Sequence, residues 1–150
     1  MDKIVVSPPS NTLAPLKQPS EEQTSSPADL ASFGPMVRVP FGHVSLGRAG
    51  DKGSNCNVGF FVREESQWPW LRTFLNIDKF KELMDGEFTG QVIDRMEFPH
   101  LWAVHFLIHD HLDRGVTANA TYDVLGKFIC EFVRTKPVDV PEKFLVKGKI

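Results

Sequence analysis

The stretch Leu101-Trp102-Ala103-Val104-His105-Phe106-Leu107-Ile108-His109 decides the fold class, because its residues alternate in character with a period of two. In an extended strand, side chains of the same parity lie on the same face of a sheet. One face of this strand is wholly apolar and should meet a hydrophobic core: Trp102, Val104, Phe106 and Ile108. The other face carries His105 and His109 beside Leu101, Ala103 and Leu107. We therefore predict a strand that separates a core from a cleft or an assembly interface.

The segments on either side predict further strands and two helical regions. Extended patterns cover residues 37–46, with a bend at 40–42, and residues 57–63, 91–98 and 116–122. A helix is expected over residues 68–75 with Pro69 in its first turn, followed by a short helix capped by Asp78 and ended by Gly86. The clearest helical period spans residues 125–133. Strands that mostly neighbour each other in sequence indicate an α+β protein, with an antiparallel sheet covered on one face by helices.

Residues 47–57, Gly-Arg-Ala-Gly-Asp-Lys-Gly-Ser-Asn-Cys-Asn, are predicted to form a glycine-rich loop. Glycines allow main-chain N–H groups to converge on an anion, and arginine and lysine side chains add positive charge. Asp51 is suited to orient Lys52, or to act as a base if its pKa is raised. Substrate-binding candidates are Arg48, Gly50, Gly53, Ser54, Asn55 and Asn57, with Asp51 and Lys52 as catalytic candidates. The alternative is a connection whose charges lie in water.

Two histidines of the central strand, His105 and His109, are further catalytic candidates. A half-buried histidine that faces a cavity titrates near neutrality and can move a proton; the alternative is a structural histidine satisfied by hydrogen bonds. The two residues lie about 13 Å apart along an extended strand, too far to share one ion. No recognised metal-ligand spacing occurs, so no metal is predicted. Cys56 would be a nucleophile only beside a histidine, and Cys130 is expected in the core.

Length and composition predict one domain of 36–150 preceded by a disordered tail. Residues 1–35 are rich in proline and serine and lack a sustained apolar period, so they cannot bury enough surface to order themselves. A net charge of -2 without a basic cluster argues against a nucleic-acid or anionic-membrane surface. No segment approaches the length of a membrane span. The chain's 2 cysteines make no disulfide framework, which favours reduced thiols and a cytoplasmic location.

The string Arg48-Ala49-Gly50-Asp51-Lys52-Gly53-Ser54-Asn55-Cys56-Asn57-Val58-Gly59, followed by Trp68-Pro69-Trp70-Leu71, resembles the signature of the AtuA-like ferredoxin-fold domain. That domain follows a larger N-terminal region in the acyclic terpene utilisation proteins. Matches continue in family order through Gly115-Val116-Thr117, Gly126-Lys127 and residues 137–141, so the resemblance covers roughly residues 39–141. Cys56 stands where the family pattern has a small residue, and Asp113-Arg114-Gly115 replaces a more glycine-rich turn. The resemblance implies a free-standing, ferredoxin-like α+β sandwich.

The sequence is compatible with two functions. The resemblance implies metabolism of branched or terpenoid acids or acyl-CoA esters, which suits a cofactor-independent lyase, hydratase, isomerase or cyclase acting on a carboxylate, acyl-CoA, terpenoid or polyketide-like substrate. In that enzyme the Gly-Asp-Lys-Gly segment holds the anionic group. The alternative is a non-catalytic binding or assembly subunit of a larger AtuA-type protein. A homodimer or higher homo-oligomer is expected in either case, because such domains often associate through sheet faces or edges.

Overall fold

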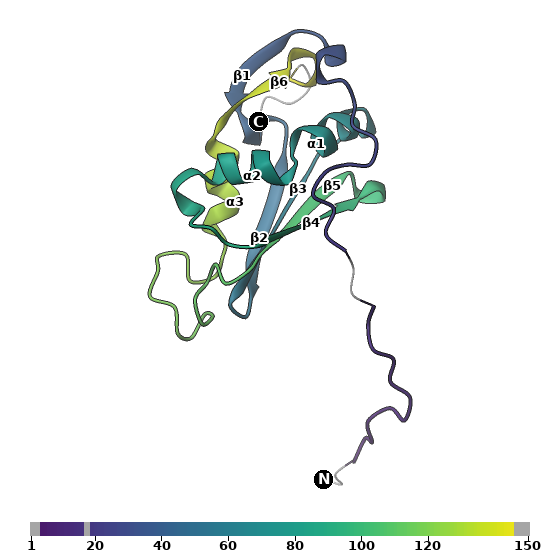
Figure 1. Cartoon of the computed structure of the whole chain (residues 1–150), viewed down its shortest axis with the longest axis vertical. Coiled ribbons are helices and arrows are strands. Elements are labelled where there is room, and N and C mark those ends of the chain that lie inside the picture. Colours follow the sequence, from purple (N-terminus) through teal and green to yellow (C-terminus); the bar gives the residue numbers. More distant parts are fainter. Residues whose placement is uncertain (1–3, 17–18, 146–150) are drawn as a thin grey trace.

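The computed structural model describes residues 4–16 and 19–145, and within them it has two antiparallel sheets and three α-helices (Figure 1). The larger sheet has the strand order β2-β3-β5-β4, and the smaller one pairs β1 with β6. The strands are β1 Met36–Pro40, β2 Leu46–Lys52, β3 Asn55–Phe61, β4 Ile93–Phe98, β5 Ala103–Ile108 and β6 Pro137–Pro141. The helices are α1 Trp68–Phe74, α2 Ile77–Met84 and α3 Phe128–Thr135. This confirms the predicted α+β class.

The order of the larger sheet is that of a split β-α-β unit. Strands β3 and β4 both pair antiparallel with β5, so they run parallel to each other, and the chain between them passes through α1 and α2. Strand β2 forms a hairpin with β3 and so becomes the second edge of the sheet. The arrangement is ferredoxin-like, with β2 on the edge beside β3.

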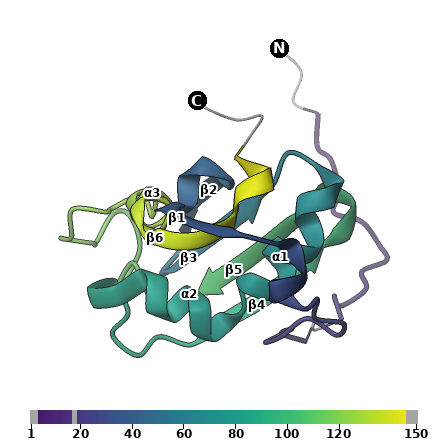
Figure 2. The same cartoon turned by 90° about the horizontal axis from the view of Figure 1, so that it is seen from above.

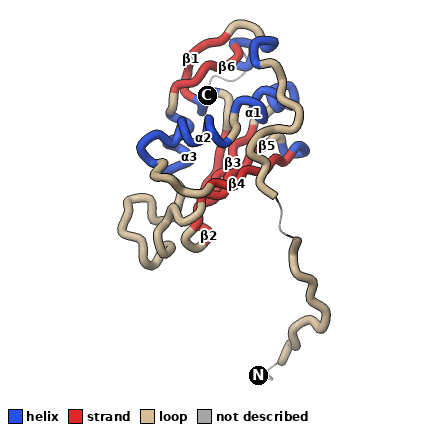
Figure 3. Tube along the Cα trace, viewed as in Figure 1, coloured by secondary structure: helices blue, strands red, loops and turns tan. Residues whose placement is uncertain are grey.

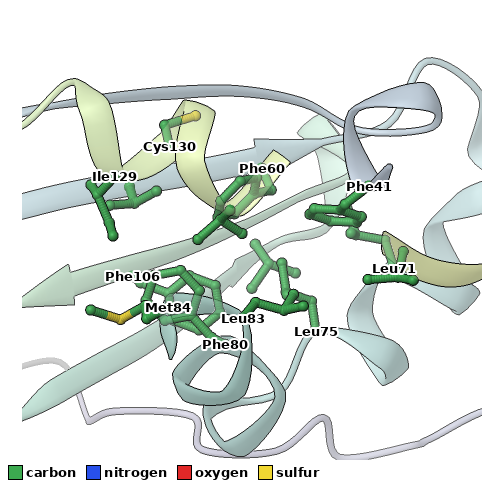
Figure 4. Close-up of a cluster of buried hydrophobic side chains, with 14 of the residues drawn as sticks. Phe41, Phe60, Leu71, Leu75, Phe80, Leu83, Met84, Phe106, Ile129 and Cys130 are labelled. Atoms are coloured by element: carbon green, nitrogen blue, oxygen red, sulfur yellow. The ribbon is translucent and has the colours of Figure 1, made fainter. Parts of the chain in front are cut away.

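All three helices pack against the same face of this sheet (Figure 2). The predicted parity of β5 is confirmed, because Val104, Phe106 and Ile108 are buried against the helices. The ring of Phe106 stacks on Phe80 of α2 with centroids 3.9 Å apart (Figure 4). Burial of such large apolar side chains contributes about 1.5–3 kcal/mol each, which makes this layer the main source of stability. Within residues 4–16 and 19–145, no α-helix packs on the opposite face of the sheet.

The segment predicted as a loop, residues 47–57, is a β-hairpin. Its residues pair from Gly47↔Phe60 to Lys52↔Asn55, which leaves a two-residue turn at Gly53 and Ser54. Gly53 has a φ of 66°, a left-handed conformation that glycine adopts without the penalty of a Cβ atom. The glycines therefore serve a tight turn and strand packing, and the main-chain N–H groups run along a ladder instead of converging on one point.

The chain between β5 and α3 contains no strand, although extended structure was expected at 116–122 (Figure 3). Helix α3 begins at Phe128, three residues later than its apolar period suggests. The carboxylate of Asp123 accepts hydrogen bonds from the backbone N–H groups of Lys127, Phe128 and Ile129. These bonds satisfy donors that a helix start leaves unpaired and fix the first turn of α3. In the same way α2 is capped by Asn76, not by Asp78.

Part of the predicted tail contacts the domain. The backbone N–H of Glu21 donates to the carbonyl of Arg95 at 2.7 Å, and that of Ile77 donates to the carbonyl of Glu22. The side chain of Arg95 is fully buried and donates to the carbonyls of Leu75, Arg72 and Glu21 at 2.8–3.0 Å. The segment from Ser20 therefore lies along the free edge of β4. Disorder remains a prediction for the residues before it.

Candidate functional site

The sheet face without helices collects most of the predicted site residues, and we call it the open face. Side chains that are opposite each other in register lie on the same face of a sheet. Four consecutive partners across the strands β2-β3-β5-β4 are Arg48, Gly59, His105 and Met96. The next row toward the hairpin turn contains Gly50, Asn57, Leu107 and Asp94. Lys52 and Asn55 follow beside the turn, and Leu46, Phe61, Ala103 and Phe98 form an apolar row at the other end.

His105 is the half-buried titratable group at the centre of this face. Burial lowers the pKa of its imidazole below the usual 6.5, and the positive charge of Lys52 lowers it further. The ring is therefore neutral at pH 7. Its Nδ1 atom is buried and has no hydrogen-bond partner among the described residues. The ring of Phe98 lies edge-on with its centroid 6.1 Å away. A neutral imidazole of this kind can accept a proton near neutral pH.

His109 has a different environment, although it lies on the same face. Its Nε2 atom is 2.7 Å from a carboxylate oxygen of Asp94, and both side chains are more than a third exposed. Sequence reasoning did not select Asp94. The signal for it was present, because residues 91–98 read as a strand and the parity of that strand places Asp94 with Met96 and Phe98.

Asp51 and Lys52 point to opposite faces of β2, because adjacent residues of a strand alternate. Lys52 is opposite Asn55, whereas Asp51 is opposite the buried Cys56 on the helix-bearing side. The Nζ atom of Lys52 donates to the backbone carbonyl of Asp51 at 2.7 Å, so no carboxylate orients it. Asp51 therefore does not share a face with His105, and Lys52 does.

The side chains of Ser54 and Asn55 are engaged inside the chain. The Ser54 hydroxyl donates to a carboxylate oxygen of Asp110 at 2.9 Å, and Asn55 Oδ1 accepts from the backbone N–H of Asp110 at 3.0 Å. These bonds tie the hairpin turn to the end of β5. Among the remaining substrate-binding candidates, Arg48 is exposed on the open face and Asn57 is half-buried there.

Neither cysteine has the properties of a nucleophile. Burial raises the pKa of both Cys56 and Cys130 to about 12, so both are protonated thiols at neutral pH. The Cys56 thiol donates to the carbonyl of Gly126 at 3.2 Å. Both residues are fully buried, Cys130 on α3, as expected, and Cys56 on β3.

Three pockets of about 290–360 Å³ lie away from the predicted site. The largest is lined by α2 and the start of β4, another lies between the helices and the β1–β6 sheet, and the third is beside Gln67 and Phe144. Within residues 4–16 and 19–145, no cluster of three or more histidine, cysteine or acidic side chains has metal-site geometry. Over the same residues, no helix is both long and apolar enough to cross a membrane.

A model of the AtuA ferredoxin-like domain matches residues 39–139, more than half of the chain, so the protein belongs to that family. No curated protein and no solved structure matches the chain. The match spans the larger sheet and all three helices, together with the part of the β1–β6 pair that lies between residues 39 and 139. It therefore covers the open face completely.

Proposed function

We propose that this member of the AtuA ferredoxin-like domain family is a cofactor-independent acid–base enzyme whose reaction takes place on the open face. The single observation that carries the proposal is His105: a neutral, half-buried imidazole on the same face as two cationic side chains. The reaction class is that of a lyase, hydratase, isomerase or cyclase. The substrate is a carboxylate or acyl thioester with a terpenoid or polyketide-like chain, and the compartment is the cytosol.

His105 acts as the base in this scheme. Its imidazole removes a proton from the carbon next to the substrate carbonyl, and the electron pair moves onto the carbonyl oxygen. Arg48 and Lys52 stabilise that developing negative charge and hold an anionic group of the substrate. The proton then returns to another substrate atom, a carbon in an isomerisation or a departing oxygen in a dehydration. The enzyme ends unchanged, and no external oxidant or reductant takes part.

The apolar row beside these groups suits the hydrocarbon part of such a substrate. Leu46, Phe61 and Phe98 extend the face beyond His105 in the direction away from the charged hairpin turn. Phe98 is 42% exposed, which is high for a phenylalanine and leaves apolar area to be covered. The face thus offers a cationic end for a carboxylate or thioester oxygen and an apolar end for the chain.

Deuterium exchange tests the proposal without knowledge of the final product. The protein is incubated in D₂O with branched carboxylic acids and acyl-CoA esters, and deuterium at the α-carbon is measured by mass spectrometry. Exchange should be lost in His105→Gln and reduced about 100-fold or more in Lys52→Ala, within the range of general-base catalysis. His43→Gln is the matched control, because His43 is exposed and lies in the turn Phe41–His43 beside α3, outside the larger sheet. Equal exchange by His105→Gln and the native protein would refute His105 as the base.

A binding or assembly subunit remains the second candidate, favoured by the openness of the sheet face. None of the described pockets includes a residue of this face, and enzymes usually enclose their substrates. In this case the face would complete the surface of a larger AtuA-type protein. This function predicts that the immobilised chain retains such a protein. Arg48→Glu should abolish the retention, whereas Arg38→Glu on β1 should not. Substrate exchange by the isolated chain would exclude it.

A further inference from the structure

We propose that the open face binds the open face of a second copy of this chain, about a two-fold axis that runs parallel to the strands and between β3 and β5. The pairing is independent of the reaction proposed above. The inference that the site combines residues of both copies does rest on that reaction. Two-fold pairing of identical surfaces requires a surface that is complementary to itself. The distribution of charge and of side-chain size on the open face therefore decides which two-fold axis is possible.

Positive charge gathers at the β2 edge of the open face. Arg48 and Lys52 stand two rows apart, and Gly50 between them has no side chain. The Nζ atom of Lys127 lies 3.7 Å from the position that a Cβ atom on Gly50 would take, and it donates to the carbonyl of Ala49. Lys127 therefore adds a third cation beside the buried Gly50, which lies between Arg48 and Lys52 on this strand.

Negative charge lies at the opposite edge. Asp94 on β4 is in the same row as Gly50, three strands away across the sheet. An axis parallel to the strands places β2 of one copy over β4 of the other and keeps the rows level. Asp94 then faces the partner's Gly50 and lies about 7 Å along the strand from both Arg48 and Lys52 of the partner subunit, within reach of their long side chains.

The other possible axis in the plane of the interface, perpendicular to the strands, gives a worse match. It places β2 over the β2 strand of the second copy, so that cations face cations. Like charges placed opposite each other in an interface repel and disfavour the contact. Charge therefore selects the axis parallel to the strands.

Side-chain size agrees with that axis. In the central row, His105 faces the partner's Gly59, where an imidazole meets no side chain. In the apolar row, Phe61 faces the partner's Ala103, and Leu46 faces the partner's Phe98. Large side chains thus meet small ones at the centre, and the two apolar rows face each other, so the hydrocarbon part of the proposed substrate would lie between them.

The pairing also brings cation and base together. Arg48 and His105 of one copy are two strands apart, about 10 Å, and their side chains point the same way without converging. The partner's Arg48 points back toward this sheet, displaced from His105 by one strand spacing of about 5 Å. The proposed site would therefore use His105 of one copy with the partner's Arg48, and each copy alone is incomplete.

The size of the face sets the expected strength. Four strands spaced about 4.8 Å apart and about six residues long give a flat area of roughly 400 Å² per copy. Such an interface lies at the small end of specific contacts, so we expect dissociation constants in the micromolar range. The dimer should then form and dissociate within ordinary laboratory concentrations.

Sedimentation of the whole chain between about 1 and 200 μM, a range that brackets micromolar affinity, tests the proposal through charge reversal. The native protein should move from 16.9 kDa toward twice that mass as concentration rises. Arg48→Glu/Lys52→Glu and Asp94→Arg should each stay monomeric, with dimerisation weakened at least 10-fold. A mixture of the two variants should dimerise again, because the β2 edge of each copy then meets an opposite charge on the other. Arg38→Glu and Asp139→Arg, an exposed pair on the β1–β6 sheet, are matched controls that should dimerise like the native protein.

Rescue in the mixture also proves that both variants are folded. Three outcomes would each overturn the proposal. The native protein could stay monomeric up to the highest concentration, neither variant could weaken the dimer, or the two variants could fail to dimerise when mixed. Mass is measured without substrate, so failure of the proposed reaction leaves this result untouched. An independent readout is the imidazole NMR signal of His105, which should shift with concentration in the native protein and in the mixture, whereas that of His43 should not.

Discussion

Replacement of Arg95 by methionine should destabilise the protein by about 4 kcal/mol, because its guanidinium is fully buried and donates to three carbonyls. Methionine keeps the apolar stem and removes the donors. Buried acceptors without a partner cost about 1–3 kcal/mol each, and breaking a buried ion pair costs about 3–5 kcal/mol. The bonds to Glu21 and Arg72 are only partly buried, so the full cost applies to the carbonyl of Leu75 alone, about 1 kcal/mol. The Glu97 carboxylate, 2.9 Å from Arg95, keeps Arg72 as a partner at 2.7 Å, so the ion pair adds about 3 kcal/mol, the low end of its range.

Urea denaturation measures the effect directly. With a slope of about 2 kcal/mol per molar urea, the midpoint should fall by roughly 2 M while the slope itself stays unchanged. Arg95→Lys keeps the charge but has one nitrogen for several acceptors, so about half of the loss is expected. Arg38→Met is the control, since its side chain is 63% exposed and its ion pair contributes less than about 1 kcal/mol. A loss below about 1 kcal/mol in Arg95→Met would refute the role assigned to this network.

Three further predictions concern the strand packing and the titrating groups. Gly47→Ala should lower the free energy of unfolding by about 1–3 kcal/mol in thermal denaturation, because the new Cβ atom would lie 2.5 Å from Cys130 Sγ. Adding Cys130→Ala to the same chain should recover much of that loss. If the losses of the two single variants simply add in the double variant, the clash is contradicted. The buried Cys56 thiol, with its pKa raised to about 12, should react with a thiol reagent at pH 8 only after unfolding, and fast labelling of the folded protein would exclude this burial. His105 should titrate below pH 6.5 by NMR, and Lys52→Ala should raise its pKa only part of the way, because burial is the larger cause. Because the pKa of His105 is lower in the folded than in the unfolded chain, the unfolded chain binds the proton first as pH falls. His105 should therefore make the free energy of unfolding decrease as pH decreases below about 6.5. A His105 pKa at or above 6.5 would contradict the environment described for it.

The larger sheet could be predicted because its strands carry their own pattern. In β5 the alternation separates Val104, Phe106 and Ile108 from the histidines, and the structure buries the first set alone. Helix α1 begins near Pro69 and α2 ends at Met84, close to the glycine that was expected to end it. These features depend on contacts between near neighbours, and local pattern reports such contacts well.

The hairpin of residues 46–61 could not be predicted because its glycines have a tertiary purpose. Glycine at position 47 lets Cys130 of α3 approach β2, and the residues near Gly47 in sequence do not indicate that contact. The contact of residues 20–22 with β4 could not be predicted either, because it depends on hydrogen bonds from a segment without an apolar period. For the site, sequence reasoning grouped Asp51 with Lys52 because they are adjacent, whereas strand geometry separates them and joins Lys52 to His105 instead.

The pairing of β1 with β6 has a consequence for how this domain can be combined with others. The backbone N–H of Glu142 donates to the carbonyl of Pro35 at 2.9 Å, so the residues just before β1 and just after β6 are in contact. A unit whose two ends meet can be inserted into a surface loop of a host protein without forcing the host's flanking residues apart. The same geometry permits a circular permutant in which a short linker joins the two ends and new termini open in the long connection between β5 and α3. Either design must also retain residues 20–22, because the Glu21 carbonyl accepts a hydrogen bond from the buried Arg95 side chain.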